Sequence, residues 1–290
     1  MVKLEAKKIG ETFRQLRKEE KYKGPDLVAG ITSISSLNKF EKGDLNLSFA
    51  KVIMLLDRLH ISADEFIQLI EPDFGRSYQD LINKIYQDYV HKDIRSLREA
   101  LDDVAKRYQN EESNFGILIQ AVVVALIKDL DPNFVVEPEI NNQLFDYLMA
   151  VENWGNFQIS IFNNCLTILS SQMIHSIMKE LAFKISKMAH VHDNQEYALT
   201  AIVNAVEVLL NRNDLAGAQQ LVRFFENAQL SQEASVIRIK LVFFKNLLSK
   251  NSDALQDNSS LIHTLRIIGS KQLASSYEEY QEKFLQEHPF

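Results

Sequence analysis

The segment from residue 32 to residue 43 carries hydroxyl and ammonium groups at spacings that suit contact with DNA. Its apolar residues Ile34, Leu37 and Phe40 fall on one side of a helix, and its small and basic residues fall toward the other. A short helix with a small, basic outer face can enter the major groove of DNA. We therefore predict groove contacts from Ser33, Ser35, Ser36 and Lys39, and phosphate contacts from Arg14, Arg17 and Lys42.

Two of these residues have a second interpretation that the sequence leaves open. Ser33 precedes the helix, so its hydroxyl is at least as well placed to cap the helix N-terminus as to touch a base. Arg17 can instead form an ion pair with Glu41 inside the same small domain. Because serine hydroxyls contact phosphates and base edges with little selectivity, these residues predict no particular operator sequence.

The elements that would position these residues are short helices in residues 1–70. From Ile9 onward, apolar residues recur four and three residues apart, as on one face of a helix. Gly43 is typical of the residue that ends a helix. Ser62 and Glu65 form a capping box, which indicates the start of another helix. The sequence therefore predicts a five-helix domain with a helix-turn-helix in its middle.

The distribution of charge agrees with a DNA-binding role for this domain. The whole chain has a net charge of −7, but residues 1–42 hold ten Lys and Arg against six Asp and Glu. DNA binding requires a local basic face and not a basic protein. The alternative is that these lysines and arginines only form a solvated surface.

Residues 71–290 are predicted to form a second, helical domain. The sequence Glu71-Pro72-Asp73-Phe74-Gly75 interrupts the helical pattern, which places the domain boundary at about residue 70. Breaks at Asp93, Asp131, Asp214 and Asp253 are 38, 83 and 39 residues apart, consistent with a unit of about 40 residues if one break is missed. We therefore expect helix-hairpin repeats stacked into a solenoid, with an irregular bundle as the alternative.

Several functional classes lack support in the sequence. No apolar run reaches the length of about 18 residues that a membrane span needs, and the N-terminus has no apolar signal region, so we expect a cytoplasmic protein. The one cysteine, Cys165, lies in an apolar context that does not activate a thiol. His190 and His192 are by themselves only a weak signal for a metal site. No cofactor, metal or catalytic residue is predicted.

Several segments resemble the Rgg/MutR transcriptional regulators of Gram-positive bacteria, over nearly the whole chain. The resemblance in the first domain is in the opening helix, the end of the recognition helix and the next two helices, at Ile9–Arg17, Asn38–Gly43, Leu55–Leu59 and Ile61–Phe66. In the second domain it is in a distinctive central segment, at Val151–Gly155, Gln158–Ile159 and Asn163–Cys165.

This resemblance implies an all-α fold, with an N-terminal helix-turn-helix domain followed by a tetratricopeptide-like helical-repeat domain. It also implies a homodimer that binds promoter DNA and a short hydrophobic signalling peptide. Several positions depart from the family pattern. Lys39 and Lys42 stand where arginine is usual, and lysine lacks the bidentate fork of arginine. Phe49 stands where some relatives have a cysteine that bridges the dimer.

A peptide receptor of this kind needs amide side chains for an extended backbone, together with apolar pockets. Asn153 also departs from the family, since some relatives carry arginine there. Each amide residue could instead be a helix cap, and Trp154 could belong to the core. The predicted peptide contacts are Lys84, Asn153, Trp154, Gln158, Asn163, Asn164, Asn204 and Asn211.

The sequence thus favours a DNA-binding transcription regulator controlled by a short intracellular peptide, as in quorum sensing. One alternative is a DNA-binding regulator whose helical domain only dimerises or binds another protein. Another is a helical-repeat scaffold whose first domain binds protein. The sequence indicates no enzyme.

Overall fold

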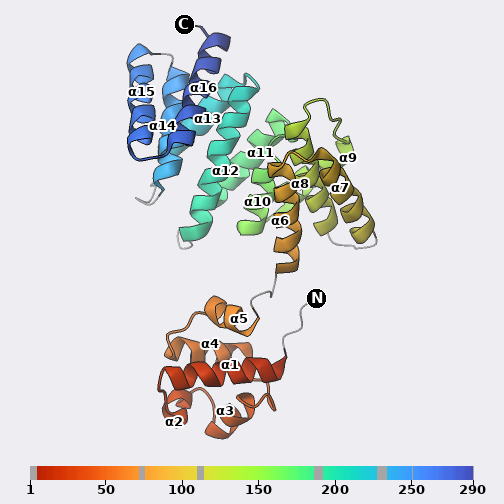
Figure 1. The fold of residues 1–290 in the computed structure, drawn as a ribbon, viewed down its shortest axis with the longest axis vertical. Coiled ribbons are helices and arrows are strands. Elements are labelled where there is room, and N and C mark those ends of the chain that lie inside the picture. Colours follow the sequence, from red (N-terminus) through yellow and green to blue (C-terminus); the bar gives the residue numbers. More distant parts are fainter. Residues whose placement is uncertain are drawn as a thin grey trace. The chain divides into compact units, whose positions relative to one another are not determined.

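The computed structural model describes residues 5–71, 76–109, 114–185, 192–226, 234–249 and 251–289 (Figure 1). All regular structure in these residues is α-helical, which confirms the predicted fold class. The chain divides into two compact units, residues 1–87 and 88–290. This division falls inside helix α6 (Arg76–Val90), whereas the sequence placed a domain boundary near residue 70.

The first unit begins with five short helices that surround one apolar core. Phe13 is fully buried and meets the rings of Phe40 and Phe66 edge to face, so α1, α3 and α5 share this core. The predicted Ser62 cap is present, since its hydroxyl accepts a hydrogen bond from the Glu65 amide. These helices are α1 (Ala6–Glu19), α2 (Gly24–Val28), α3 (Ile34–Phe40), α4 (Phe49–Arg58) and α5 (Ala63–Ile70).

Close backbone packing joins α1 to the end of α3. A Cβ atom added to Gly10 would lie 2.1 Å from the carbonyl oxygen of Phe40, so only glycine allows this approach. Gly43 ends the α3 segment with φ +79, and a Cβ there would meet the backbone of Lys7 at 2.6 Å. The two glycines therefore fix α3 against α1.

The second unit is a series of helices that pack in two alternating sets. Helices α8, α10, α12 and α14 each contact the next of this set, while α7, α9, α11, α13 and α15 pack against their sequence neighbours. The elements of this unit beyond α6 are α7 (Ile94–Tyr108), α8 (Phe115–Leu130), α9 (Pro138–Ala150), α10 (Asn156–Asn164), α11 (Ser171–Ile185), α12 (His192–Asn211), α13 (Leu215–Glu226), α14 (Ser235–Ser249), α15 (Ser252–Ile267) and α16 (Lys271–Glu287).

The spacing of these helices agrees with the expected repeat of about 40 residues. The even-numbered helices begin at residues 115, 156, 192, 235 and 271. Successive starts thus differ by 36 to 43 residues, as in stacked helix hairpins. The predicted break at Asp93 is the N-cap of α7, where its carboxylate accepts a hydrogen bond from the Ser96 amide.

Helix α8 forms the most apolar part of the second unit. Its residues 118, 119 and 121–127 are all buried. An apolar surface on every side of a helix requires neighbours on every side, and α7, α9 and α10 supply them. No helix in the described part of the chain is long and apolar enough to cross a membrane.

Candidate functional site

Helix α3 presents its polar side at the surface of the first unit. Leu37 and Phe40 are buried, as expected, while Ile34 is 41% exposed and does not belong to the core. Ser35 and Lys39 are exposed on this helix. The helix therefore offers a solvent-facing side with a hydroxyl and an ammonium group one turn apart.

The contacts of both alternative interpretations made for this region are present in the structure. The Ser33 hydroxyl caps α3, because it accepts a hydrogen bond of 3.0 Å from the Ser36 amide and lies 2.9 Å from the Ser36 hydroxyl. The guanidinium of Arg17 pairs with Glu41 through two contacts of 2.5 and 2.8 Å and also donates to the Tyr22 carbonyl. Ser33 and Arg17 thus hold α3 in place.

Other basic residues of the prediction remain at the surface. Lys42, just after α3, is exposed. The Arg14 side chain is half exposed, and its guanidinium lies 3.9 Å from Glu41. Together with Lys39, these residues place three cationic groups on α1 and around the end of α3.

In the second unit, two of the predicted amide residues belong to one polar network. The Asn204 side-chain amide on α12 donates a hydrogen bond of 2.8 Å to the Asn163 side-chain oxygen on α10. Lys240 on α14 donates a hydrogen bond of 2.7 Å to the Asn204 oxygen. Its ammonium also pairs with Glu207 at 2.6 Å. Side chains from three successive even-numbered helices are therefore connected.

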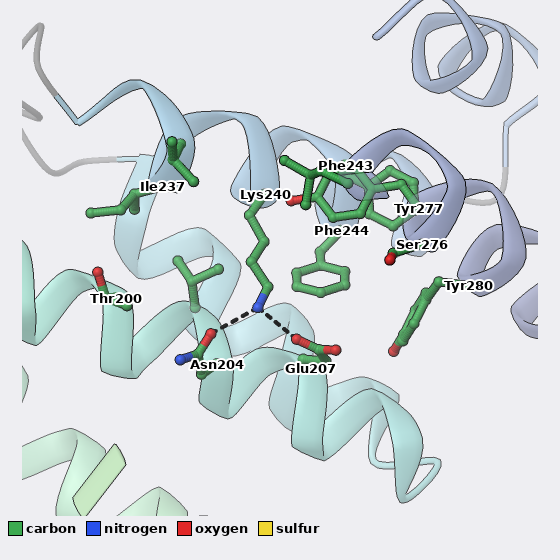
Figure 2. A pocket seen from close by; sticks show the side chains of 13 residues that line it. Thr200, Asn204, Glu207, Ile237, Lys240, Phe243, Phe244, Ser276, Tyr277 and Tyr280 are labelled. Carbon is green, nitrogen blue, oxygen red and sulfur yellow. Dashed lines mark hydrogen bonds and ion pairs between the residues drawn. The ribbon is translucent and has the colours of Figure 1, made fainter. Parts of the chain in front are cut away.

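This network lies at a cavity of about 500 Å³, a volume in the range of small-ligand sites (Figure 2). Aromatic and aliphatic side chains form most of its surface, and Lys240, Glu207 and Asn204 supply its charged and amide groups. Three helices contribute, α12 with Thr200, Val203, Asn204 and Glu207, α14 with Val236, Ile237, Lys240, Phe243 and Phe244, and α16 with Leu273, Ser276, Tyr277 and Tyr280.

The aromatic residues of the cavity are packed against one another. Phe243 stacks on Tyr277 with ring centroids 4.5 Å apart, and Phe244 meets Tyr280 edge to face. Burial, followed by the negative charge of Glu207, raises the pKa of Tyr277 to about 12. Burial, followed by the negative charges of Glu207 and Glu287, raises the pKa of Tyr280, so both phenols remain protonated at neutral pH.

The other predicted peptide contacts lie elsewhere in the described structure. Trp154 is buried in the core against Phe162, and Gln158 caps α10 and donates to the Tyr147 hydroxyl. The Asn164 side chain donates to Ser160. Asn211 contacts the cavity lining, because its side-chain oxygen accepts a hydrogen bond from the Tyr280 hydroxyl. Lys84 on α6 and Asn153 in the loop before α10 are exposed.

Lys240, Glu207 and the aromatic residues of α14 and α16 were not among the sequence predictions. The helical periodicity could have indicated apolar helix faces that contain Phe243, Phe244, Tyr277 and Tyr280. It carried no signal that these faces meet around a lysine.

Chemistry other than binding finds little support in the described residues. Burial raises the pKa of the Cys165 thiol well above its usual value, which keeps it protonated. No group of three His, Cys, Asp or Glu residues in the described part of the chain is arranged as metal ligands. The side chains of His190 and His192 lie outside the described residues.

Comparisons with known proteins agree on the fold. Residues 98–279 match the family model described as the C-terminal domain of the HTH-type transcriptional regulator Rgg. The structure resembles the SHP pheromone receptor Rgg2 of Streptococcus dysgalactiae, with a TM-score of 0.76, 20% identity, and coverage of 95% of this chain and 99% of that chain.

Two further structures have similar folds. One is a putative transcriptional regulator from Listeria monocytogenes EGD-e, with a TM-score of 0.75, 17% identity, and coverage of 97% of this chain and 98% of that chain. The other is PrgX in the PrgX/iCF10 complex, with a TM-score of 0.74, 18% identity, and coverage of 98% of each chain. At these identities the likeness establishes a shared fold across both units.

Proposed function

Since the chain belongs to the Rgg family of HTH-type transcriptional regulators, we propose that it binds promoter DNA as a homodimer and responds to a short apolar peptide. In this proposal residues 1–70 form the DNA-binding domain, and residues 71–290 bind the peptide and form the dimer. The protein acts in the cytoplasm by binding, without a catalytic step. The fold shared with a pheromone receptor and with PrgX supports this assignment.

The exposed polar side of α3 is the observation that supports the DNA role. Ser35 and Lys39 face solvent on a short helix that Gly10 and Arg17 hold against the domain core. We propose that this side enters the major groove, and that Arg14 and Lys42 contact phosphates beside it. A single unit of this size makes few contacts, so two copies reading two half-sites suit the task.

The cavity between α12, α14 and α16 is the observation that supports the peptide role. Its surface combines apolar side chains with a few polar groups, the pattern typical of sites for small apolar ligands. A peptide that binds one arrangement of the dimer better than another would shift the spacing of the two DNA-binding domains.

Binding of labelled promoter DNA at two salt concentrations tests the DNA role. We expect Lys42→Ala to reduce the salt dependence, measured as the slope of log affinity against log salt, by about one for each bound copy. Lys39→Ala should weaken binding at both salt concentrations. Lys106→Ala, an exposed lysine of α7, is the matched control. Absence of binding by the unmodified protein at low salt would reject the DNA role.

Calorimetry with short peptides encoded near the gene tests the peptide role. Heat from one of these peptides, lost on substitution of Phe244→Ala in the cavity, is the expected result. If no peptide gives heat while promoter binding is intact, the second domain only dimerises or binds another protein.

A further inference from the structure

The polar centre of the cavity is an ion pair that retains unused hydrogen-bonding capacity. The Lys240 ammonium has three N–H groups, and two of them are used by Asn204 and Glu207. Glu207 binds Lys240 through Oε2, and its Oε1 has no hydrogen bond within the described part of the chain. The Lys240 and Glu207 side chains are 24% and 35% exposed. The pair therefore offers one donor and one acceptor to a ligand.

The opposite charges of the pair discriminate against charged ligand groups. A carboxylate that approaches Lys240 also approaches Glu207, so attraction and repulsion largely cancel. The same holds for an ammonium group near Glu207. In both cases the ligand still loses the hydration of its charge on entering an apolar cavity. A neutral group with both an acceptor and a donor meets no repulsion and satisfies both free positions.

The backbone of one extended residue has this combination on a single side, since its N–H donates, its carbonyl accepts, and both point the same way, unlike the two groups of one trans peptide bond. We infer that the Lys240–Glu207 pair recognises the uncharged backbone of one extended residue of the ligand, with the carbonyl of that residue directed at Lys240 and its N–H at Glu207. This inference rests on the proposed function and defines the chemistry of the peptide segment that occupies the cavity.

The shape of the cavity specifies the neighbours of that residue. In Figure 2 the Lys240 side chain extends across the cavity toward α12, with Ile237 and Thr200 on one side and Phe244 and Tyr280 on the other. A backbone that crosses the pair at this residue places the preceding residue against one of these surfaces and the following residue against the other. The bound residue therefore lies within the peptide, between two apolar residues, and is not a free terminus.

Three compounds of nearly equal size test the inference without knowledge of the natural peptide. N-acetyl-phenylalanine-N-methylamide is neutral, N-acetyl-phenylalanine carries a carboxylate, and phenylalanine-N-methylamide carries an ammonium group. Their affinities for the full chain are measured by saturation-transfer NMR titration. We expect the neutral compound to bind about tenfold more tightly than either charged compound, because each charged compound meets a like charge.

Single substitutions should reverse this selectivity. Glu207→Gln removes the repulsion of carboxylates, so N-acetyl-phenylalanine should gain about tenfold in affinity. Lys240→Met should instead favour the ammonium compound, because Glu207 is then unpaired. Glu279→Gln and Lys179→Met alter exposed residues of α16 and α11 and are the matched controls. Circular dichroism confirms that each variant is folded, and Glu207→Gln is the more conservative of the two.

Two results would overturn the inference. One is equal or tighter binding of a charged compound by the unmodified protein, and the other is the absence of saturable binding by all three. Either result with intact promoter binding rejects the role of the ion pair and leaves the DNA role in place. Conversely, if the three compounds show the expected selectivity but the protein does not bind promoter DNA, only the DNA role is rejected.

Discussion

At the level of single residues, Arg17 and Glu41 form a largely buried ion pair in the first unit. Glu41 is only 4% exposed, and Arg17 is bound to it through two nitrogen atoms. We predict that Arg17→Ala lowers the free energy of unfolding of this unit by about 3 kcal/mol, because it leaves a buried carboxylate with no cation closer than Arg14 at 3.9 Å. Urea unfolding followed by circular dichroism measures the change.

Arg14→Ala is the comparison for that measurement, since the Arg14 side chain is 53% exposed. It should change stability by less than about 0.5 kcal/mol, while weakening DNA binding if Arg14 contacts phosphate. Equal losses of stability in the two variants would contradict the structural role of Arg17.

Cys165 is a second residue whose environment determines its behaviour. Its side chain is fully buried and burial raises the thiol pKa, so the reactive thiolate is scarce. We predict that an aromatic disulfide reagent labels the native protein far more slowly than the protein in guanidinium chloride, where one thiol per chain should react. Rapid, complete labelling of the native protein would contradict this burial.

The candidate site was predictable from sequence only in part, and the reason lies in which residues carry a local signal. Asn163 and Asn204 stand out because amides among apolar helical residues are unusual, and the structure joins them. Lys240 and Glu207 look like ordinary surface charges of helices, since sequence periodicity does not reveal which helices meet. Ser33 had two physically sound roles, and the structure shows the cap on α3, a contact that depends on the backbone geometry at the helix start.

At the level of elements, residues with a left-handed backbone conformation (positive φ) follow several of the helices. Lys92, with φ +56, lies between α6 and α7, and the Asp93 amide donates to the Asp88 carbonyl. Asn213, with φ +61, lies in the same arrangement between α12 and α13. These are Schellman-type helix ends, in which glycine is the preferred residue.

We predict that Lys92→Gly stabilises the second unit by about 0.5 to 1 kcal/mol, because glycine adopts positive φ without strain. Thermal unfolding measures the gain. Lys179→Gly, in the middle of α11, should instead lose about 1 kcal/mol. A loss in both variants would show that strain at Lys92 is negligible.

The close approach of α1 to α3 gives a second prediction for elements. Gly10→Ala places a methyl group 2.1 Å from the Phe40 carbonyl oxygen, so the helices must separate. We expect a loss of about 2 to 3 kcal/mol in the stability of the first unit, together with weaker DNA binding. Gly30→Asn is the control, since this position has φ +75 and open space around it, and asparagine tolerates positive φ.

Helix types and the repeat length followed from sequence because they depend on local periodicity. Helix ends were less predictable, since residues such as Lys92 end a helix without the usual glycine. Ile34 is more exposed than its place on the apolar side of the helix predicted. A seven-residue helix has few core contacts, and its first turn lies at the edge of the domain.

At the scale of the whole molecule, two compact units predict two unfolding events. The single tryptophan, Trp154, is buried in the second unit, so its fluorescence reports on that unit, whereas circular dichroism reports on both. We predict that Gly10→Ala shifts part of the urea transition seen by circular dichroism and leaves the fluorescence transition unchanged. A shift of both signals by the same amount would show that the two units unfold together.

The three helices around the cavity begin at residues 192, 235 and 271, so each belongs to a different level of the stacked hairpins. The width of the cavity consequently depends on the spacing between successive levels at that point. A ligand with bulkier side chains would require a wider spacing between these levels. Ligand size would thereby set the curvature of the stacked hairpins.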